Sequence, residues 1–145
     1  MRLWHKDLIS VLPDKQLFGQ WRECCMIAKA LKDDNLNHLL VNKVKNYPLT
    51  HFAIYGFKVF DEMKDRGFAG KLETFTKYLP EWFNLDDVPV DENGEVCNKD
   101  LFPHWHNDRY LKQCLYNLQE KFDSKGIPQN EWNRIVTRFG DKYDL

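Results

Sequence analysis

Apolar residues recur at helical spacing near the start of the chain. Within residues 14–32 they lie four, three, four and three positions apart, which places them on one face of a helix; they are Leu17, Trp21, Cys24, Ala28 and Leu31. Asp14 follows Pro13 and is a suitable first residue for that helix. The pattern predicts a long amphipathic helix that ends near Lys32.

Five more segments carry helical patterns or the signals that start and stop helices. They cover residues 37–48, 50–67, 71–79, 106–126 and 128–140. Thr50 and either Asn107 or Asp108 are predicted caps, and Gly67 follows a last helical turn. No alternating β-branched run is long enough to predict a strand. We therefore expect an all-α protein: a single compact domain over residues 1–145, with about four to six helices around an aromatic core.

The composition is that of an ordinary globular domain, with 43% hydrophobic and 30% charged residues. No apolar run approaches the roughly 20 residues that span a bilayer. Charges stand in the first ten positions, where a secretory signal would need apolar residues. We expect a cytoplasmic protein with no membrane span, in which the four cysteines are reduced thiols.

The charge of the chain is unevenly distributed. The formal net charge is −1, which argues weakly against a large nucleic-acid surface. Residues 81–100 hold seven acidic residues and one lysine, so the rest of the chain carries a small positive excess. Either one face of that remainder attracts phosphate groups, or the acidic segment is simply a solvated loop. Charge alone does not decide between the two.

A polar stripe accompanies Glu23 on the first predicted helix. Gln16, Gly19 and Gln20 precede it by seven, four and three positions and share its side of the helix. A mid-helix glycine lowers helix stability by about 1 kcal/mol relative to alanine, but it helps where another backbone or a ligand must come close. The stripe is either a solvated surface or a site where the chain end packs over Gly19 and reaches Glu23.

Several short motifs occur at both ends and in the middle of the chain. They are RLWHKDLISVLPDKQLFGQWRE, HLLVNKV, the KDRGF helix ending, LQEKF and the terminal RFG. Together they resemble the pyrimidine-dimer DNA glycosylase family, of the phage endonuclease V type. The resemblance is closest to the bacterial branch, whose members begin with a similar RLWH…DLI…LP…QL…RE pattern.

This resemblance implies a DNA repair enzyme with coupled DNA glycosylase and AP lyase activities. In the family, the α-amino group of the N-terminal residue attacks the anomeric sugar carbon of a damaged nucleotide and forms an imine. A glutamate on the first long helix assists, and β-elimination then nicks the strand. Glu23 matches this glutamate, and Arg22 matches the arginine beside it. An α-amino group has a pKa of about 7.7–8.0, which makes it a usable nucleophile near neutral pH.

The residue after the initiator methionine determines whether that methionine is removed, and so which residue carries the α-amino group. Because Arg2 is too bulky for ordinary methionine removal, the predicted nucleophile is the amine of Met1. Lys121 matches a basic family position, whereas Asn117 stands where the family has an arginine. We therefore expect Met1 and Glu23 to be catalytic. The residues expected to contact DNA are Arg2, His5, Gln16, Arg22, His106 and Lys121.

The histidines leave two interpretations open. HWHND, residues 104–108, places two of them just before a predicted helix. Their spacing relative to Cys97 or Cys114 matches no standard zinc site, so no metal is expected. His5 and His106 either contact DNA or the active site, or they cap helices and pack in the interior.

The predicted function is excision of a damaged pyrimidine, in a pyrimidine dimer, by a monomer that needs no cofactor. Its predicted partner is double-stranded DNA that contains a lesion. Two alternatives stay open: a glycosylase for a different modified base, and a helical DNA- or protein-binding domain without catalysis.

Overall fold

The computed structural model describes residues 2–35, 37–81, 83, 92–93 and 101–145. Over these residues the chain forms one 3₁₀ helix, six α-helices and no strand. The elements are η1 (Lys6–Val11), α1 (Asp14–Lys32), α2 (Leu39–Lys45), α3 (Leu49–Asp65), α4 (Glu73–Thr76), α5 (Asp108–Asp123) and α6 (Gln129–Tyr143). The prediction of an all-α fold is confirmed.

Most helix boundaries lie within a few residues of those predicted. Helix α1 begins at Asp14, as expected, and Asn107 caps α5 by accepting a hydrogen bond from the Tyr110 N–H at 2.9 Å. Gly67 has φ +81°, the left-handed conformation expected of a residue that ends a helix. Helix α3 starts at Leu49 rather than after a Thr50 cap, because Pro48 is its N-cap and already has a conformation compatible with a helix start.

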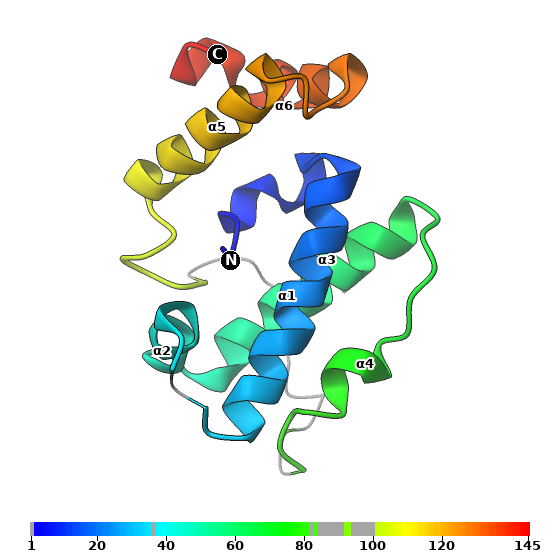
Figure 1. Cartoon of the computed structure of the whole chain (residues 1–145), viewed down its shortest axis with the longest axis vertical. Helices are drawn as coiled ribbons and strands as arrows, with labels where there is room; N and C mark the ends of the chain where they lie inside the picture. Colours follow the sequence, from blue (N-terminus) through cyan, green and yellow to red (C-terminus); the bar gives the residue numbers. More distant parts are fainter. Residues whose placement is uncertain (1, 36, 82, 84–91, 94–100) are drawn as a thin grey trace.

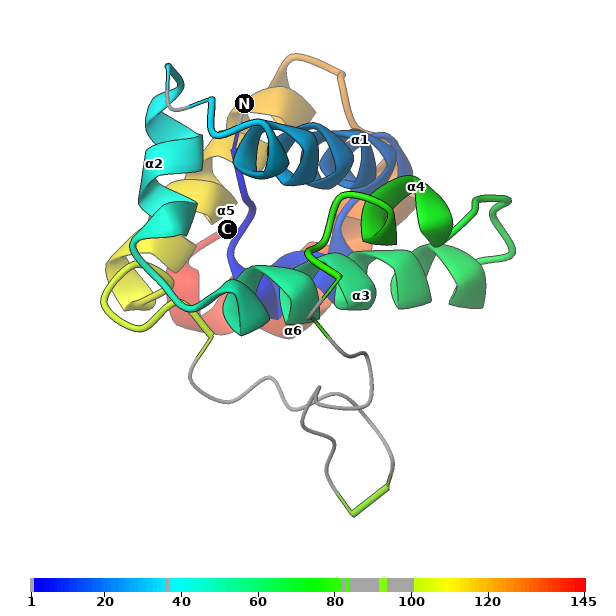
Figure 2. The same cartoon turned by 90° about the horizontal axis from the view of Figure 1, so that it is seen from below.

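The helices form two groups (Figure 1). Helix α1 packs across α3, with α2 and α4 beside them, and α5 packs on α6 at the other end of the molecule. The start of the chain runs through the interior between the groups, close to α1, α3 and α5 (Figure 2). Leu3, Trp4 and Leu8 are buried there. The N-terminal segment is therefore part of the core rather than a tail.

Aromatic side chains fill much of this core, as predicted. Around the N-terminal segment, Tyr55, Phe102 and His106 contact one another with ring centroids 5.0–5.9 Å apart. On the other side of α3, Phe75 packs so closely that a Cβ at Gly56 would overlap its ring. The glycine at position 56 is thus required by the approach of α4 to α3.

The first turn of α1 is held by the last helix of the chain. Pro13, the N-cap residue, offers no side-chain acceptor to the free N–H groups of that turn. Glu131 of α6 supplies one instead, because its Oε1 accepts a hydrogen bond from the Asp14 N–H at 2.7 Å. Arg66 at the end of α3 also binds this corner, donating to Leu12 O at 2.7 Å and to Asp14 Oδ1 at 2.9 Å. The orientation of α1 is therefore fixed from both groups of helices.

Two further expectations concern the membrane and the thiols. Among the helices of the described residues, none is both long and apolar enough to cross a membrane. Cys24, Cys25 and Cys114 are free thiols, and burial raises the pKa of each. Cys97 lies outside the described residues.

Candidate active site

Glu23, on the polar stripe of α1, holds the beginning of the chain. Its Oε2 accepts a hydrogen bond from the backbone N–H of Arg2 at 2.8 Å. Met1, the predicted nucleophile, lies outside the described residues. The first described backbone N–H of the chain is thus bound to the carboxylate that the sequence singled out.

Gln20, one turn before Glu23, binds the same segment with both ends of its amide. Its Nε2 donates to Arg2 O at 2.9 Å, and its Oε1 accepts from the Trp4 N–H at 2.6 Å. The side chain is only 1% exposed. Two neighbouring residues of α1 therefore bind three consecutive backbone groups on one edge of the N-terminal segment.

Two tyrosines hold the rest of that segment. The Tyr55 hydroxyl, on α3, lies 2.6 Å from Trp4 O and 2.8 Å from Gln20 Oε1. The Tyr110 hydroxyl, on α5, donates to Leu3 O at 2.6 Å. Burial raises the pKa of both phenols, so they remain neutral donors at physiological pH. Helices α1, α3 and α5 thus all bind the beginning of the chain.

A cavity of about 280 Å³ opens beside Glu23. It is lined by Arg2, Trp4, Gln16, Gly19, Gln20, Glu23, Asn117 and Lys121. The predicted polar face of α1 is confirmed, because all four of its members line this cavity. Whether the chain end packs over Gly19 stays a prediction, because Met1 lies outside the described residues. Among the described side chains, a Cβ at Gly19 would come nearest to an Arg22 guanidinium nitrogen, at 4.0 Å.

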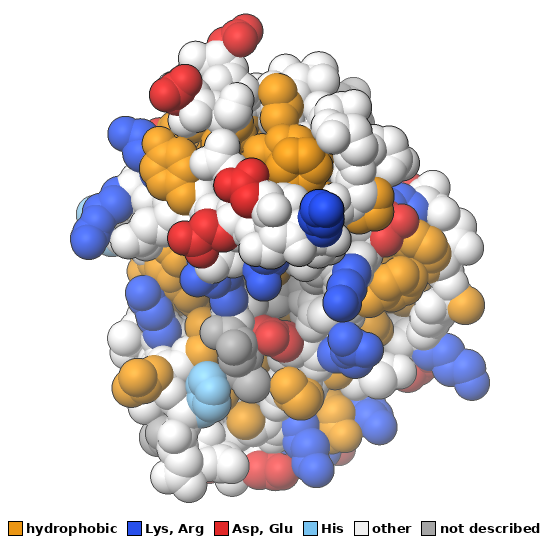
Figure 3. Space-filling model, turned by 45° about the horizontal axis from the view of Figure 1, so that its top comes forward, with side chains coloured by type: hydrophobic (Ala, Val, Ile, Leu, Met, Phe, Trp, Pro, Cys, Tyr) orange, Lys and Arg blue, Asp and Glu red, His pale blue; other side chains and the backbone are white. Residues whose placement is uncertain are grey.

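Positive side chains border this cavity. The Arg2 guanidinium lies 5.1 Å from the centroid of the Trp4 ring, and Lys121 comes from α5. Arg22 is exposed and reaches back toward Gly19. Figure 3 shows one face of the molecule on which Lys and Arg side chains gather on both sides of a hollow, with an acidic side chain between them. Such a surface attracts phosphate while keeping one carboxylate in the hollow.

Gln16 adds a polar atom that has no partner among the described residues. Its Oε1 is buried and, within the described residues, accepts no hydrogen bond. Because Gln16 lines the same cavity as Glu23, this acceptor is available to a donor group of a ligand. Arg2, Gln16, Glu23 and Lys121 are the predicted site residues that the structure brings together.

His5 and His106 lie elsewhere, in the interior. They are 3% and 5% exposed, and their rings stack with centroids 5.2 Å apart. His5 Nδ1 accepts from the Asp7 N–H at 3.1 Å, and His106 Nδ1 accepts from the Lys6 N–H at 2.9 Å. These positions favour the capping and packing interpretation for both histidines over direct contact with DNA.

The His106 ring should make folding sensitive to acid. Burial, together with the positive charges of His5, Lys6 and Lys43, lowers its pKa from 6.5 to about 2. In the unfolded chain the ring takes up a proton below about pH 6.5, whereas in the folded chain it stays neutral. The free energy of unfolding should therefore fall below pH 6.5, by up to about 1.4 kcal/mol per pH unit from this residue. Urea unfolding between pH 7 and pH 4 measures the slope.

The matched variant for this prediction is His106→Asn. The asparagine oxygen keeps an acceptor for the Lys6 N–H but has no proton to gain. Its free energy of unfolding should fall less steeply with acid than that of the wild type. Equal slopes for the two proteins would show that His106 is not the residue responsible.

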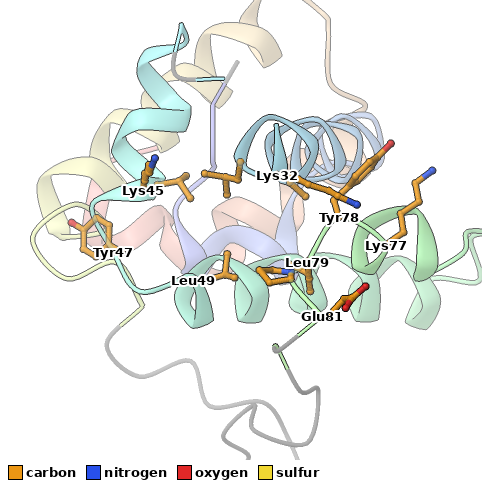
Figure 4. A pocket seen from close by; sticks show the side chains of 12 residues that line it. Lys32, Lys45, Tyr47, Leu49, Lys77, Tyr78, Leu79 and Glu81 are labelled. Carbon is orange, nitrogen blue, oxygen red and sulfur yellow. The ribbon is translucent and has the colours of Figure 1, made fainter. Parts of the chain in front are cut away.

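A larger cavity, of about 540 Å³, lies between α1, α2, α3 and the segment that follows α4 (Figure 4). Lys32, Lys45 and Lys77 are among its lining residues, over a largely apolar floor. Lys45 is already paired with Asp34 at 2.9 Å. The cavity contains neither Glu23 nor the start of the chain, so its size does not make it the site of the predicted chemistry.

Across the described ranges, no group of three or more His, Cys, Asp or Glu side chains is arranged to hold a metal ion. The side chains at the candidate site are a carboxylate, a buried amide, tyrosine hydroxyls and cations.

Sequence reasoning did not predict four residues of this site. Gln20 lay on the predicted polar stripe, but the stripe could also have been a solvated surface. Its hydrogen bonds to the N-terminal segment were therefore not predicted. Tyr55 and Tyr110 lie within predicted helices, and their hydroxyls gave no local signal. Asn117, named only for its difference from the family, lines the cavity beside Lys121.

A model of a known protein family matches the part of the chain that builds most of this site. The family is described as pyrimidine dimer DNA glycosylase, and the match covers residues 1–75, just over half of the chain. Neither a curated protein nor a solved structure gives a match. The bacterial branch stays a prediction. The matched residues include Arg2, Gln20, Glu23 and Tyr55, and the chain therefore belongs to the pyrimidine dimer DNA glycosylase family.

Proposed function

We propose that this protein excises a damaged pyrimidine of a pyrimidine dimer from double-stranded DNA and then cleaves the strand as an AP lyase. The nucleophile is the α-amino group of Met1, and Glu23 assists it. Membership of the glycosylase family supports the reaction class. The observation that carries the mechanism is the hydrogen bond from the Arg2 N–H to Glu23 at 2.8 Å.

The hydrogen bond from the Arg2 N–H to Glu23, combined with covalent geometry, limits the distance between the amine and the Glu23 carboxylate. Two carbon atoms separate the α-amino nitrogen of residue 1 from the Arg2 nitrogen, so the two nitrogens are at most about 3.7 Å apart in any conformation. Added to the 2.8 Å hydrogen bond, this limit keeps the amine within about 6.5 Å of the Glu23 carboxylate. A nucleotide sugar placed in the cavity beside Glu23 would lie within reach of both groups.

The chemistry then follows from the two groups. The unprotonated amine attacks C1′ of the damaged nucleotide, the bond from C1′ to the base breaks with the electron pair leaving on the base, and the bound amine gives up a proton. The bond from C1′ to O4′ then breaks, O4′ becomes a hydroxyl as it takes up a proton, and the nitrogen and C1′ form the iminium. The Glu23 carboxylate stabilises the positive charge that develops on the sugar and on the resulting iminium. Removal of a proton from C2′ and departure of the 3′ phosphate complete the β-elimination, with Glu23 placed to accept that proton.

The residues around the cavity support a role in binding the strand. Arg2 and Lys121 line the cavity and would neutralise phosphate charge, as would the exposed Arg22. Gln16 Oε1, which accepts no hydrogen bond from the described residues, would accept one from a donor on the nucleotide. His5 and His106 are not used in this proposal, because they are buried behind a different surface.

Borohydride trapping tests the proposal directly. We expect the wild-type protein to become covalently linked to irradiated duplex DNA, because borohydride reduces the imine to a stable amine. Sequencing of the linked peptide should place the bond on the N-terminal residue. Intact mass of the free protein, measured first, shows whether Met1 is present.

Two further substrates separate the possible outcomes. Trapping on DNA with an abasic site, but not on irradiated DNA, would support the lyase step and contradict dimer excision. Trapping at a lysine would contradict the role of the α-amine. No trapping on either substrate, with normal binding to duplex DNA, would favour a DNA-binding domain without catalysis.

A further inference from the structure

We propose that Gln20 is a positioning residue, which sets the register of the N-terminal segment against Glu23 and thereby fixes the place of the reactive amine. The inference rests on the proposed function, because it concerns the same amine and the same carboxylate. Gln20 acts through the backbone of Arg2 and Trp4.

The hydrogen bonds show how one side chain sets a register. In an extended segment, the N–H and C=O groups of residues i and i+2 point to the same edge. Arg2 N–H, Arg2 O and Trp4 N–H all bind α1, whereas Leu3 O points to the opposite side and binds Tyr110. The Gln20 amide donates from Nε2 to Arg2 O and accepts at Oε1 from the Trp4 N–H, and so takes the place of a neighbouring strand.

The spacing of Gln20 and Glu23 makes the arrangement specific. The two residues are three positions apart and lie on the same face of α1. A slip of the segment by one residue would turn the Arg2 and Trp4 groups away from the helix and move the amine by about 3.3 Å. Displacements of about 1 Å in an active site can lower rates by about 100-fold.

The described hydrogen bonds of Gln20 go to the protein, although the residue also lines the cavity. Gln20 is 1% exposed; its Nε2 donates to Arg2 O, and its Oε1 lies within 2.8 Å of both the Trp4 nitrogen and the Tyr55 hydroxyl. The contacts of Gln20 with the N-terminal segment are therefore the ones through which we propose that it acts.

The first test is Gln20→Met in the full-length protein, which keeps the size of the side chain and removes both polar ends. We expect the single-turnover rate of borohydride trapping to fall by about 100-fold, with little change in the affinity for the same DNA. Amide exchange of Arg2 and Trp4, followed by NMR, should become faster. Ile27→Val, a change at another buried position of α1, is the folding control and should alter neither reading.

The second variant is Gln20→Glu, compared with the wild type at pH values at which both proteins are folded, so that loss of stability does not enter the comparison. The introduced carboxyl can donate to Arg2 O only when protonated, and burial favours the protonated form. The ratio of its trapping rate to the wild-type rate at the same pH should therefore rise as the pH falls. This variant also decides the question if Gln20→Met does not fold.

The outcomes separate this inference from the proposed function. Wild-type trapping together with unchanged trapping and amide exchange in Gln20→Met would overturn the positioning role, as would a pH-independent ratio for Gln20→Glu. Faster amide exchange in Gln20→Met, without any trapping by the wild type, would support the inference that Gln20 holds the N-terminal segment. It would contradict the proposed chemistry.

Discussion

Glu23→Gln should lower the rate of base excision by about 10²- to 10⁴-fold, the usual contribution of a positioned proton-transfer group. The amide keeps the size of the side chain and an acceptor for the Arg2 N–H, now 2.8 Å away, but it loses the negative charge that stabilises the sugar cation and the iminium. Folding and DNA affinity should stay close to those of the wild type. Single-turnover excision on irradiated duplex DNA measures the effect.

Glu131→Gln is the matched control for this experiment. Glu131 also accepts a backbone N–H, that of Asp14 at 2.7 Å, and is even more buried, but it lies in α6 away from the cavity. Its substitution should affect stability and leave excision in the folded protein unchanged. Full excision by the Glu23→Gln protein would remove the carboxylate from the mechanism.

Adding one glycine ahead of Met1 should abolish trapping through the α-amine. Each added residue moves the amine by up to about 3.8 Å along the chain, beyond the limit that the Arg2–Glu23 hydrogen bond imposes. The described hydrogen bonds of Arg2, Leu3 and Trp4 do not involve the added residue, so the fold should persist. The extended protein can be made by protease cleavage of a tag that leaves one glycine. Borohydride trapping on abasic DNA then measures whether the α-amine still reacts.

A glycine added after Leu145 is the control for the extension, because it lengthens the chain at the other end. That protein should trap DNA as the wild type does. Full trapping by the N-terminally extended protein, with the link still on its first residue, would mean that the position of the amine is not restricted by Glu23.

Much of the fold could be predicted because its signals are local. The apolar spacing of α1, the Asn107 cap and the left-handed Gly67 are each set by a few neighbouring residues, and all three agree with the structure. The polar stripe of α1 was likewise readable, since one turn of helix determines which residues share a face. Helix patterns alone thus located half of the cavity wall.

The rest of the site depends on residues far apart in the sequence. Tyr110 binds Leu3 and His106 binds Lys6 across about a hundred residues, and no local pattern encodes such pairs. The contact between Gln20 and the N-terminal segment was missed for the same reason: the helix face of Gln20 was evident, but the backbone that it binds belongs to another part of the chain.

The cap that Glu131 provides for α1 has a consequence for the order of folding. During synthesis, the residues that carry the amine leave the ribosome first, yet Tyr110, which binds Leu3, and Glu131, which caps α1, both belong to the last third of the chain. Contacts over such separations form slowly, because a long loop must close before they stabilise anything. Glu23 is therefore synthesised long before all the contacts that fix the N-terminal segment beside it can form. The amine and the carboxylate reach their final arrangement only when the two ends of the protein have come together.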